Sequence, residues 1–538
     1  MPEALTVAPD LDAATSALAA ATAVIHRSAA HLAAQGAAAV DEHQVVAYDL
    51  AHAAAGVEVG RVAVDYGAKG SIEAAIACAF VGDVVVDLAS RVSGRVGPWG
   101  LTADDGAPLA AAVVAVEPSR DPTWLATLAD EPGPRHLDGD FDLVARTFHR
   151  FADERIAPLA GDIHRGNTDI PEEIISGLGE LGAFGLSIPE EYGGSATGAE
   201  SDYLAMVVAT EELSRASLAA GGSLITRPEI LARALMRGGT EGQQREWLPR
   251  LASGEVMVAV AVTEPDHGSD VAGLTVAATR HGDDWVVDGT KTWSTFAARA
   301  DVVMLLARTD PDRSKAHRGL SMFVVPTERA DGHGFVQTQP GGGRLEGRPI
   351  ATIGYRGMHS YELAFDGWRV PGANLVGGDV GVGRGFYYQM AGFDNGRLQT
   401  AARAVGVMQA AYEAAVAYAG ERQVFGRRVG GYQLTAVKLA RMAVTIQACR
   451  QYMYEVGRLM AKGGGALEAS MVKAFACRAA EWVTREAMQI HGGMGYAEEY
   501  AVSRYFVDAR VLSIFEGADE TLALKVVARR LLERASGR

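Results

Sequence analysis

At 538 residues, the chain is too long for one compact core, so we expect two to four packed units. Hydrophobic residues make up 48% and charged residues 22%, which is typical of a soluble globular protein. A formal net charge of −16 argues against nonspecific binding to nucleic acid or to an anionic membrane surface.

The cysteines and the N-terminal residues indicate the cellular compartment of the protein. Cys78, Cys449 and Cys477 form no C-x-x-C pair and no metal-ligand spacing, so we expect small buried thiols in reducing surroundings and no metal site. The N-terminus lacks a basic region, and Asp10 and Asp12 interrupt its apolar residues, which argues against a secretory signal. No apolar run approaches the length of a membrane span. The sequence therefore predicts a cytoplasmic protein without a membrane anchor.

The first hundred residues are rich in Ala and Val. Their spacing predicts amphipathic helices over 13–34, 41–66 and 72–92. The following stretch, 93–134, contains several prolines and is expected to be an irregular connector. Helical spacing returns from Phe141 to about Pro249.

The pattern changes at Met257 and changes back at Gly385. From Met257 to Arg369, short apolar runs of β type are separated by Gly, Asp and Pro, which predicts a small all-β unit. The clearest runs are 258–262, 285–287, 302–306 and 321–325. From Gly385 to the end the spacing is again that of long helices.

This order predicts an α+β, mostly helical chain in four parts. We expect a helical N-terminal extension with its linker over 1–134, an N-terminal helical domain over 135–256, a middle β domain over 257–378 and a C-terminal helical bundle over 379–538. The nearest approach to a dinucleotide-binding glycine pattern, Gly381–Gly385, follows no strand, so a Rossmann site is not expected.

Two segments of the β region carry candidate flavin contacts. Residues 262–270 read VTEPDHGSD, a loop dense in Thr, Ser and Gly whose amides can hold a flavin ring edge and a pyrophosphate. Taken alone, this segment is equally well a polar loop that closes a hairpin. Residues 291–295 read KTWST, and a Trp on a strand is usually part of the core.

Two segments of the C-terminal region carry candidate phosphate contacts. Residues 422–426 read RQVFG and are followed by Gln433. The Arg422 guanidinium suits pyrophosphate oxygens, although an Arg at a helix entrance is usually a surface residue. Residues 489–495 read QIHGGMG, in which two glycines either admit a nucleotide close to the backbone or simply break a helix. Residues 514–517 then read IFEG, and an isolated Glu in such a turn is normally solvated.

In this order, these segments resemble the signatures of the acyl-CoA dehydrogenase family, from about Phe141 to the C-terminus. The resemblance implies FAD as cofactor and α,β-dehydrogenation of an acyl-CoA thioester. It implies that Glu516 removes the α-proton while the β-hydride passes to flavin N5. The electrons then go to electron-transferring flavoprotein. The Glu516 backbone N–H and a flavin ribityl hydroxyl would stabilise the thioester oxygen.

The resemblance also assigns roles to individual residues. Val262, Thr263, Trp293 and Thr295 would face the flavin ring, and Ser269 the pyrophosphate. Arg422, Phe425, Gln433, Gln489, Gly492 and Gly493 would contact FAD, several of them in a neighbouring subunit, which implies a homodimer or homotetramer. Asp394 and Arg397 would support the CoA and flavin side of the cleft and contact the substrate, or form only a surface ion pair. Gly517 would let the chain bend beside the base. Ser294, Phe296, Ala518 and Glu520 depart from residues that are frequent in the family.

Within the family, the segments 221–229 and 353–363 and the helical extension are similar to methylsuccinyl-CoA dehydrogenases. These oxidise (2S)-methylsuccinyl-CoA to mesaconyl-CoA in the ethylmalonyl-CoA pathway. Because a buried carboxylate needs a partner, we expect Arg227, and secondly Arg215, to bind the free carboxylate of such a substrate. Taken alone, an Arg in this position is more often a surface residue that caps a helix. The alternatives are another short or branched acyl-CoA as substrate, an acyl-CoA oxidase, and a DNA-binding relative of the fold, which the net charge disfavours.

Overall fold

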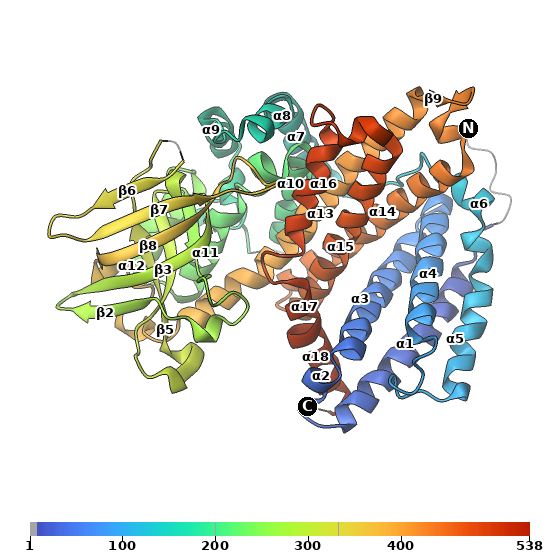
Figure 1. Ribbon diagram of the computed structural model, residues 1–538, viewed down its shortest axis with the longest axis horizontal. Coiled ribbons are helices and arrows are strands. Elements are labelled where there is room, and N and C mark those ends of the chain that lie inside the picture. Colours follow the sequence, from blue (N-terminus) through green and yellow to red (C-terminus); the bar gives the residue numbers. More distant parts are fainter. Residues whose placement is uncertain (1–7, 199–200, 332, 538) are drawn as a thin grey trace. The chain divides into compact units, whose positions relative to one another are not determined.

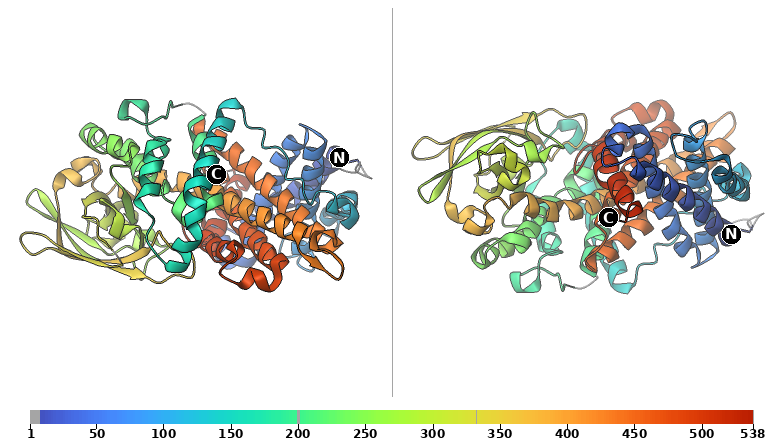
Figure 2. Two further views of the ribbon diagram at one scale, coloured as in Figure 1. Left: turned by 90° about the horizontal axis from the view of Figure 1, so that it is seen from above. Right: turned by 90° about the horizontal axis from the view of Figure 1, so that it is seen from below.

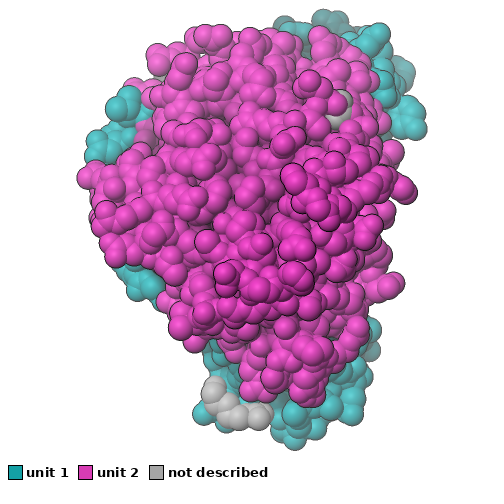
Figure 3. All heavy atoms as spheres, turned by 90° about the vertical axis from the view of Figure 1, so that its left-hand side faces the viewer, with its two compact units in different colours: residues 1–143, 400–538 teal, residues 144–399 magenta. Residues whose placement is uncertain are grey.

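The computed structural model describes residues 8–198, 201–331 and 333–537, so residues 1–7 of the expected extension lie outside the described part. The chain divides into two compact units, which Figure 3 shows in different colours. Unit 1 comprises residues 1–143 and 400–538, and unit 2 comprises residues 144–399. None of the helices in the described ranges is both long and apolar enough to cross a bilayer.

The N-terminal extension is helical in unit 1, as predicted. The break at His43, where φ is −119° and ψ is 42°, divides the helix expected over 41–66 in two. The expectation of an irregular connector over 93–134 was partly wrong. Thr102 and Asp105 form a capping box that starts a helix, and this helix accommodates Pro108. The helices of the extension are α1 (Leu11–Ala34), α2 (Ala39–Glu42), α3 (Gln44–Gly67), α4 (Ser71–Val92), α5 (Ala103–Ala115) and α6 (Pro122–Ala126).

The C-terminal helices of unit 1 share a core with the extension. In Figures 1 and 2, blue α3 and α4 lie beside α14 and α15, and the contacts between these elements agree. The rings of Phe80 and Phe475 meet edge-on, with centroids 5.7 Å apart. The three cysteines are buried here as predicted, and burial raises the pKa of Cys78 and Cys477 to about 11. The helices are α13 (Gly385–Glu421), which begins in unit 2, α14 (Gln433–Ala461), α15 (Ala466–His491), α16 (Ala501–Leu512), α17 (Asp519–Thr521) and α18 (Arg529–Ala535).

Unit 2 combines helices with one eight-stranded sheet of order β1-β4-β2-β3-β8-β7-β6, in which β5 pairs with β4. The four apolar runs expected to be β-type fall in β1, β3, β4 and β5. The strands are β1 (Val258–Ala261), β2 (Ala277–His281), β3 (Asp284–Thr295), β4 (Val302–Arg308), β5 (Leu320–Pro326), β6 (Phe335–Thr338), β7 (Arg344–Ile350) and β8 (Ser360–Val370). The helices are α7 (Gly139–Phe151), whose start belongs to unit 1, α8 (Ala157–Gly166), α9 (Glu172–Glu180), α10 (Ser201–Ala216), α11 (Thr226–Gly238) and α12 (Glu241–Ala252).

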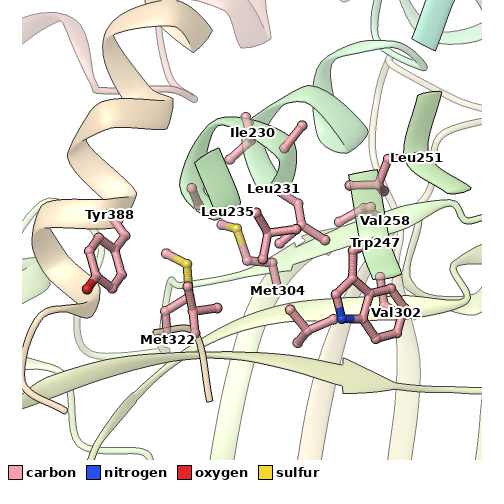
Figure 4. Packing of buried hydrophobic residues seen from close by; sticks show 14 of the residues in the cluster. Ile230, Leu231, Leu235, Trp247, Leu251, Val258, Val302, Met304, Met322 and Tyr388 are labelled. Atoms are coloured by element: carbon pink, nitrogen blue, oxygen red, sulfur yellow. The ribbon is translucent and has the colours of Figure 1, made fainter. Parts of the chain in front are cut away.

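The sheet is buried on both faces at its centre. Every residue of β4 is buried, which explains why 302–306 is apolar without alternation. On one face, Leu231 and Leu235 of α11 and Trp247 of α12 pack over Met304 and Met322 (Figure 4). The same cluster includes Val258 of β1, so this packing fixes α11 against the strand that leads into the loop 262–270.

Candidate active site

Glu516 lies in the turn between α16 and α17, in unit 1, with a half-buried side chain. Its φ is 54°, a left-handed conformation that costs a residue other than glycine roughly 1–3 kcal/mol. Gly517 follows with φ 98°, and a Cβ there would lie 3.0 Å from Leu522. Buried Lys473 on α15 donates from Nζ to the Gly517 carbonyl oxygen at 2.5 Å. The surrounding structure therefore holds this turn in a strained conformation, which a simple connection between two helices does not require.

The loop 262–270 is fixed to the end of β3 in unit 2. The Thr292 backbone N–H donates to the Thr263 carbonyl at 2.8 Å. Lys291 Nζ donates to the Val262 carbonyl and to Glu264 Oε1, each at 2.8 Å, and both charged side chains are buried. Burial lowers the pKa of Lys291 to about 8, against the opposing charge of Glu264. Lys291 and Glu264 both lie inside the sequence motifs, but nothing in those motifs indicates that the two side chains pair in the interior.

Trp293 is exposed, contrary to the usual place of a Trp on a strand. It sits at a bulge in the pairing of β3 with β8, with φ 57°, and 55% of its side chain is exposed. Two residues on, the Thr295 hydroxyl is buried and lies 2.9 Å from the Ser360 hydroxyl. The residues expected to contact the flavin ring, in the loop at 262–263 and on β3, are thus held next to one another. Ser269 lies on the exposed part of the loop.

The RQVFG segment forms a small exposed hairpin in unit 1. Gln423–Val424 pairs with Arg427–Arg428, and Phe425 and Gly426 make the two-residue turn with φ values of 48° and 82°. Phe425 is 99% exposed at the tip, and Arg422 is exposed at the base.

The remaining FAD candidates of unit 1 lie at two helix ends. Gln433 begins α14, and its Nε2 donates to Thr123 Oγ1 of α6 at 3.4 Å. Gln489 is exposed in the last turn of α15. Gly492 and Gly493 follow it, and a Cβ at either would have no described atom within 4 Å. The backbone there is open to a ligand.

Arg227 is buried, so its alternative interpretation as a surface residue was wrong. It lies in the first turn of α11 with 6% of its surface exposed. Its Nη1 donates to the Ser223 carbonyl at 3.5 Å, a long hydrogen bond, and its Cζ lies 5.9 Å from the centre of the Tyr355 ring. These are weak contacts for a buried guanidinium group.

Arg215, the second candidate, is already in an ionic network. It forms an ion pair with Asp153, and its Nε lies 3.6 Å from Oε2 of buried Glu212. Glu212 also lies 2.8 Å from Nδ1 of His149, and this contact raises the pKa of His149 against the effect of burial. The charge of Arg215 is therefore balanced within helices α7 and α10 and the residues that follow α7.

Asp394 and Arg397 form an i,i+3 ion pair, with Nη1 and Oδ1 2.7 Å apart, and a direct role toward a ligand stays a prediction. Burial raises the pKa of Asp394, and Arg397 opposes this. Between them, Asn395 donates to Glu229, which also accepts from Ser187 Oγ at 2.5 Å. Burial raises the pKa of Glu229 as well. One signal of this cluster is visible in the sequence, because Glu229 is an acidic residue among the apolar positions of α11.

A second cluster, of Asp169, His333 and His359, has potential ligand atoms within 4.8 Å of one another. His359 Nδ1 lies 2.8 Å from Asp169 Oδ1, and Arg299 lies 3.9 Å from the other carboxylate oxygen. The carboxylate is already in contact with a histidine ring and lies near a guanidinium group, so this geometry gives no argument for a cation. The expected absence of a metal stays a prediction.

The sequence models of three acyl-CoA dehydrogenase domains match the chain in order. The N-terminal domain matches residues 140–255, the middle domain residues 259–368 and the C-terminal domain residues 383–532. The extension before residue 140 lies outside these matches.

Individual relatives agree with the domain matches. The chain is 46% identical over 405 residues to (2S)-methylsuccinyl-CoA dehydrogenase of Cereibacter sphaeroides, covering 74% of this chain and 71% of the relative. A glutaryl-CoA dehydrogenase in its glutaryl-CoA complex superimposes with a TM-score of 0.67 at 30% identity, over 75% of this chain and 97% of the other. A glutaryl-CoA dehydrogenase of Mycobacterium smegmatis in complex with FADH2 gives 0.65 at 27% identity, over 75% and 96%. The chain is an enzyme of the acyl-CoA dehydrogenase family.

Proposed function

We propose that the enzyme uses FAD to oxidise (2S)-methylsuccinyl-CoA to mesaconyl-CoA. The observation that carries this proposal is the 46% identity over 405 residues to a dehydrogenase of that substrate. Buried Arg227 gives independent support, because a dicarboxylic acyl chain brings a negative charge into the protein.

Each unit, taken by itself, carries residues that suit FAD. The loop 262–270 offers amides and hydroxyls beside the exposed Trp293 ring, and an indole of this kind can cover a flavin face. Arg422 and the open backbone at Gly492 and Gly493 suit the pyrophosphate and the adenosine end. When bound, FAD supplies the acceptor for the hydride that leaves the β-carbon.

Glu516 is the proposed base. Its carboxylate takes the α-proton of the thioester, and a positioned base of this kind contributes roughly 10²–10⁴-fold. The backbone N–H of Glu516 donates to the thioester oxygen as negative charge develops there, and one such donor is worth about 3 kcal/mol. The left-handed φ of Glu516 and the bend at Gly517 support the proposal that this residue acts both through its carboxylate, as the base, and through its backbone N–H, as a donor to the thioester oxygen.

Arg227 is the proposed partner of the substrate carboxylate. A guanidinium group binds a carboxylate through two parallel hydrogen bonds and stays charged when buried. The long bond to Ser223 and the distant Tyr355 ring leave most donors of Arg227 without a strong partner among the described residues. Arg215 ranks second because Asp153 and Glu212 already balance its charge.

The proposed partners follow from the family. Electron-transferring flavoprotein would accept the electrons. The protein would be a cytoplasmic homodimer or homotetramer in which the hairpin that carries Phe425 reaches the FAD of a neighbouring subunit. The 99% exposure of Phe425 supports this contact.

An anaerobic substrate panel tests the proposal. The FAD-loaded enzyme is mixed with methylsuccinyl-CoA, butyryl-CoA and isobutyryl-CoA, and bleaching of the flavin is followed. We expect methylsuccinyl-CoA to be the best substrate by kcat/KM with a dye acceptor. Faster turnover of butyryl-CoA or isobutyryl-CoA would refute the proposal that the preferred substrate carries a free carboxylate. Rapid hydrogen peroxide formation in air would indicate an oxidase.

A further inference from the structure

The N-terminal extension contacts the turn that carries Glu516. Tyr48 and His52, one helical turn apart on α3, both face Asp519, the third residue after Glu516. Tyr48 Oη donates to Asp519 Oδ2 at 2.5 Å, and His52 Nε2 lies 3.2 Å from the same oxygen. The Tyr48 and His52 rings pack edge-on, with centroids 4.5 Å apart. Two side chains of the extension thus converge on one oxygen of the turn.

The Asp519 carboxylate depends on these contacts. Asp519 is only 8% exposed and His52 6% exposed, and a buried carboxylate is costly unless it is paired. Burial alone would raise the pKa of Asp519, but His52, Tyr48 and the charge of Arg478 hold it below its usual value. Burial, and then the bond to Asp519, raise the pKa of Tyr48 to about 12, so its hydroxyl remains a donor. The hydrogen bond from Tyr48 is therefore a charge-assisted one.

The same turn is held from α15. Lys473 donates to the Gly517 carbonyl at 2.5 Å, and the Asp519 backbone N–H donates to the Ser513 carbonyl at 3.0 Å. These anchors bracket Glu516, whose left-handed φ persists only where the surroundings hold it. Of the side chains that hold the turn, those of Tyr48 and His52 come from outside the ranges that match the family.

We propose that Tyr48 and His52 are positioning residues for the reaction: by fixing Asp519 they hold the turn 513–519 so that the Glu516 carboxylate meets the α-proton. The inference rests on the proposed role of Glu516 as the base. A displacement of about 1 Å in a reacting group can cost on the order of a hundredfold in rate. The extension then contributes to catalysis without contacting the substrate.

Tyr48→Phe tests this with little disturbance, because it removes one hydroxyl and keeps the ring packed on His52. Tyr66→Phe is the matched control. Tyr66 lies on the same helix, is 2% exposed and donates to the Pro134 carbonyl at 3.0 Å, away from the turn. Each variant loses the hydrogen bond that one hydroxyl of α3 donates, so a general loss of stability would affect both alike.

Two readouts are taken from the FAD-loaded enzymes. The first is the rate of flavin reduction by the best acyl-CoA of the panel, with kcat and KM measured separately. The second is amide hydrogen exchange over 513–522, which reports on the turn without requiring activity.

We expect Tyr48→Phe to lower kcat and flavin reduction about tenfold, with KM unchanged within about twofold, and to speed exchange over 513–522. Tyr66→Phe should leave all three unchanged. Asp519→Asn should lower the rate similarly. The double variant Tyr48→Phe/Asp519→Asn should lose little more, because both substitutions disrupt the same hydrogen bond between Tyr48 and Asp519. Because Tyr48→Phe and Asp519→Asn test the same contact from its two sides, the test stays decisive if one of these two proteins folds poorly.

Equal rates for Tyr48→Phe and Tyr66→Phe, or faster exchange of the turn at an unchanged rate, would overturn the inference alone. A wild-type enzyme whose flavin no acyl-CoA reduces would instead refute the proposed function, and the inference with it. The two failures are thus distinguishable in one set of measurements.

Discussion

Glu516 combines a strained backbone with the chemistry that the proposal assigns to it, so its substitution has a sharp expected result. Glu516→Gln keeps the side-chain volume and removes the group that takes the proton. Flavin reduction by substrate should therefore fall roughly 10²–10⁴-fold while FAD stays bound. Stopped-flow absorbance measures the rate, and Glu520→Gln, an exposed glutamate four residues on, is the control. If Glu516→Gln kept about half of the wild-type rate, another group would be the base.

Arg227 allows a prediction about selectivity. Arg227→Gln removes the charge that the proposal pairs with the substrate carboxylate. This should cost about 3 kcal/mol, or roughly a hundredfold in kcat/KM, for methylsuccinyl-CoA and little for butyryl-CoA. Arg237→Gln, on the exposed face of the same helix, is the control. An unchanged preference for methylsuccinyl-CoA would show that Arg227 is not the partner, and Arg215 would be tested next.

For single residues, the sequence predicted the positions of short motifs better than it predicted the burial and the contacts of side chains. The segments around Trp293 and Glu516 are local in the chain, so their positions could be predicted from the order of a few residues. The burial of Arg227 could not, because it depends on how α11 packs. The contact between Tyr48 and Asp519 joins residues 471 positions apart, which no local pattern reports.

Among the small elements, the hairpin at 423–428 has the clearest expected function. Phe425→Asp should weaken the association of subunits and lower the FAD content, because it places a charge on the proposed contact. The folding of the single chain should not change, since the ring is 99% exposed. Sedimentation velocity and flavin absorbance measure both effects, with Val336→Asp, at an exposed apolar position of β6, as the control. Unchanged assembly and FAD content would place the subunit contact elsewhere.

The contact between His149 and Glu212 predicts a pH-dependent stability. Its main cause, the hydrogen bond to Glu212, raises the pKa of His149 above its usual 6.5. A raised histidine pKa stabilises the fold below the unfolded pKa, and this contribution is lost as pH rises through the folded pKa. The melting temperature of His149→Gln should therefore fall further below that of the wild type at about pH 5.5 than at about pH 8.

The control for this prediction is His43→Gln, a change at an exposed histidine. It should show no such trend with pH. A difference between His149→Gln and the wild type that grows towards high pH would have the wrong sign for the assigned cause.

At the element scale, periodicity was a good guide where one face of a helix is buried. The apolar spacing of 72–92 gave the extent of α4 closely, because that helix packs through a regular face. The prolines of 93–134 were misleading, since Pro108 lies inside α5 and the capping box outweighs it. The four β runs were recognisable because the centre of the sheet is apolar on both faces, and the edge strand β6 is half exposed and gave no such signal.

For the whole molecule, the order helix, sheet, helix followed from the changes of period at Met257 and Gly385. The division into two units did not follow, because unit 1 joins the extension to residues 400–538 through contacts distant in the chain. The helices α3 and α4 pack on α14 and α15, so the extension belongs to the core beside the candidate base. The expected domain boundaries at 134, 256 and 378 stay predictions.

The central claim, FAD-dependent dehydrogenation of an acyl-CoA, is tested most directly by one anaerobic titration. The purified enzyme is titrated with (2S)-methylsuccinyl-CoA while flavin absorbance is recorded, and the thioester product is identified by mass. We expect the released flavin to be FAD, the absorbance to fall with each equivalent of substrate, and mesaconyl-CoA, two hydrogens lighter, to form in equal amount. An enzyme that carries FMN, or whose flavin no acyl-CoA bleaches, would contradict it.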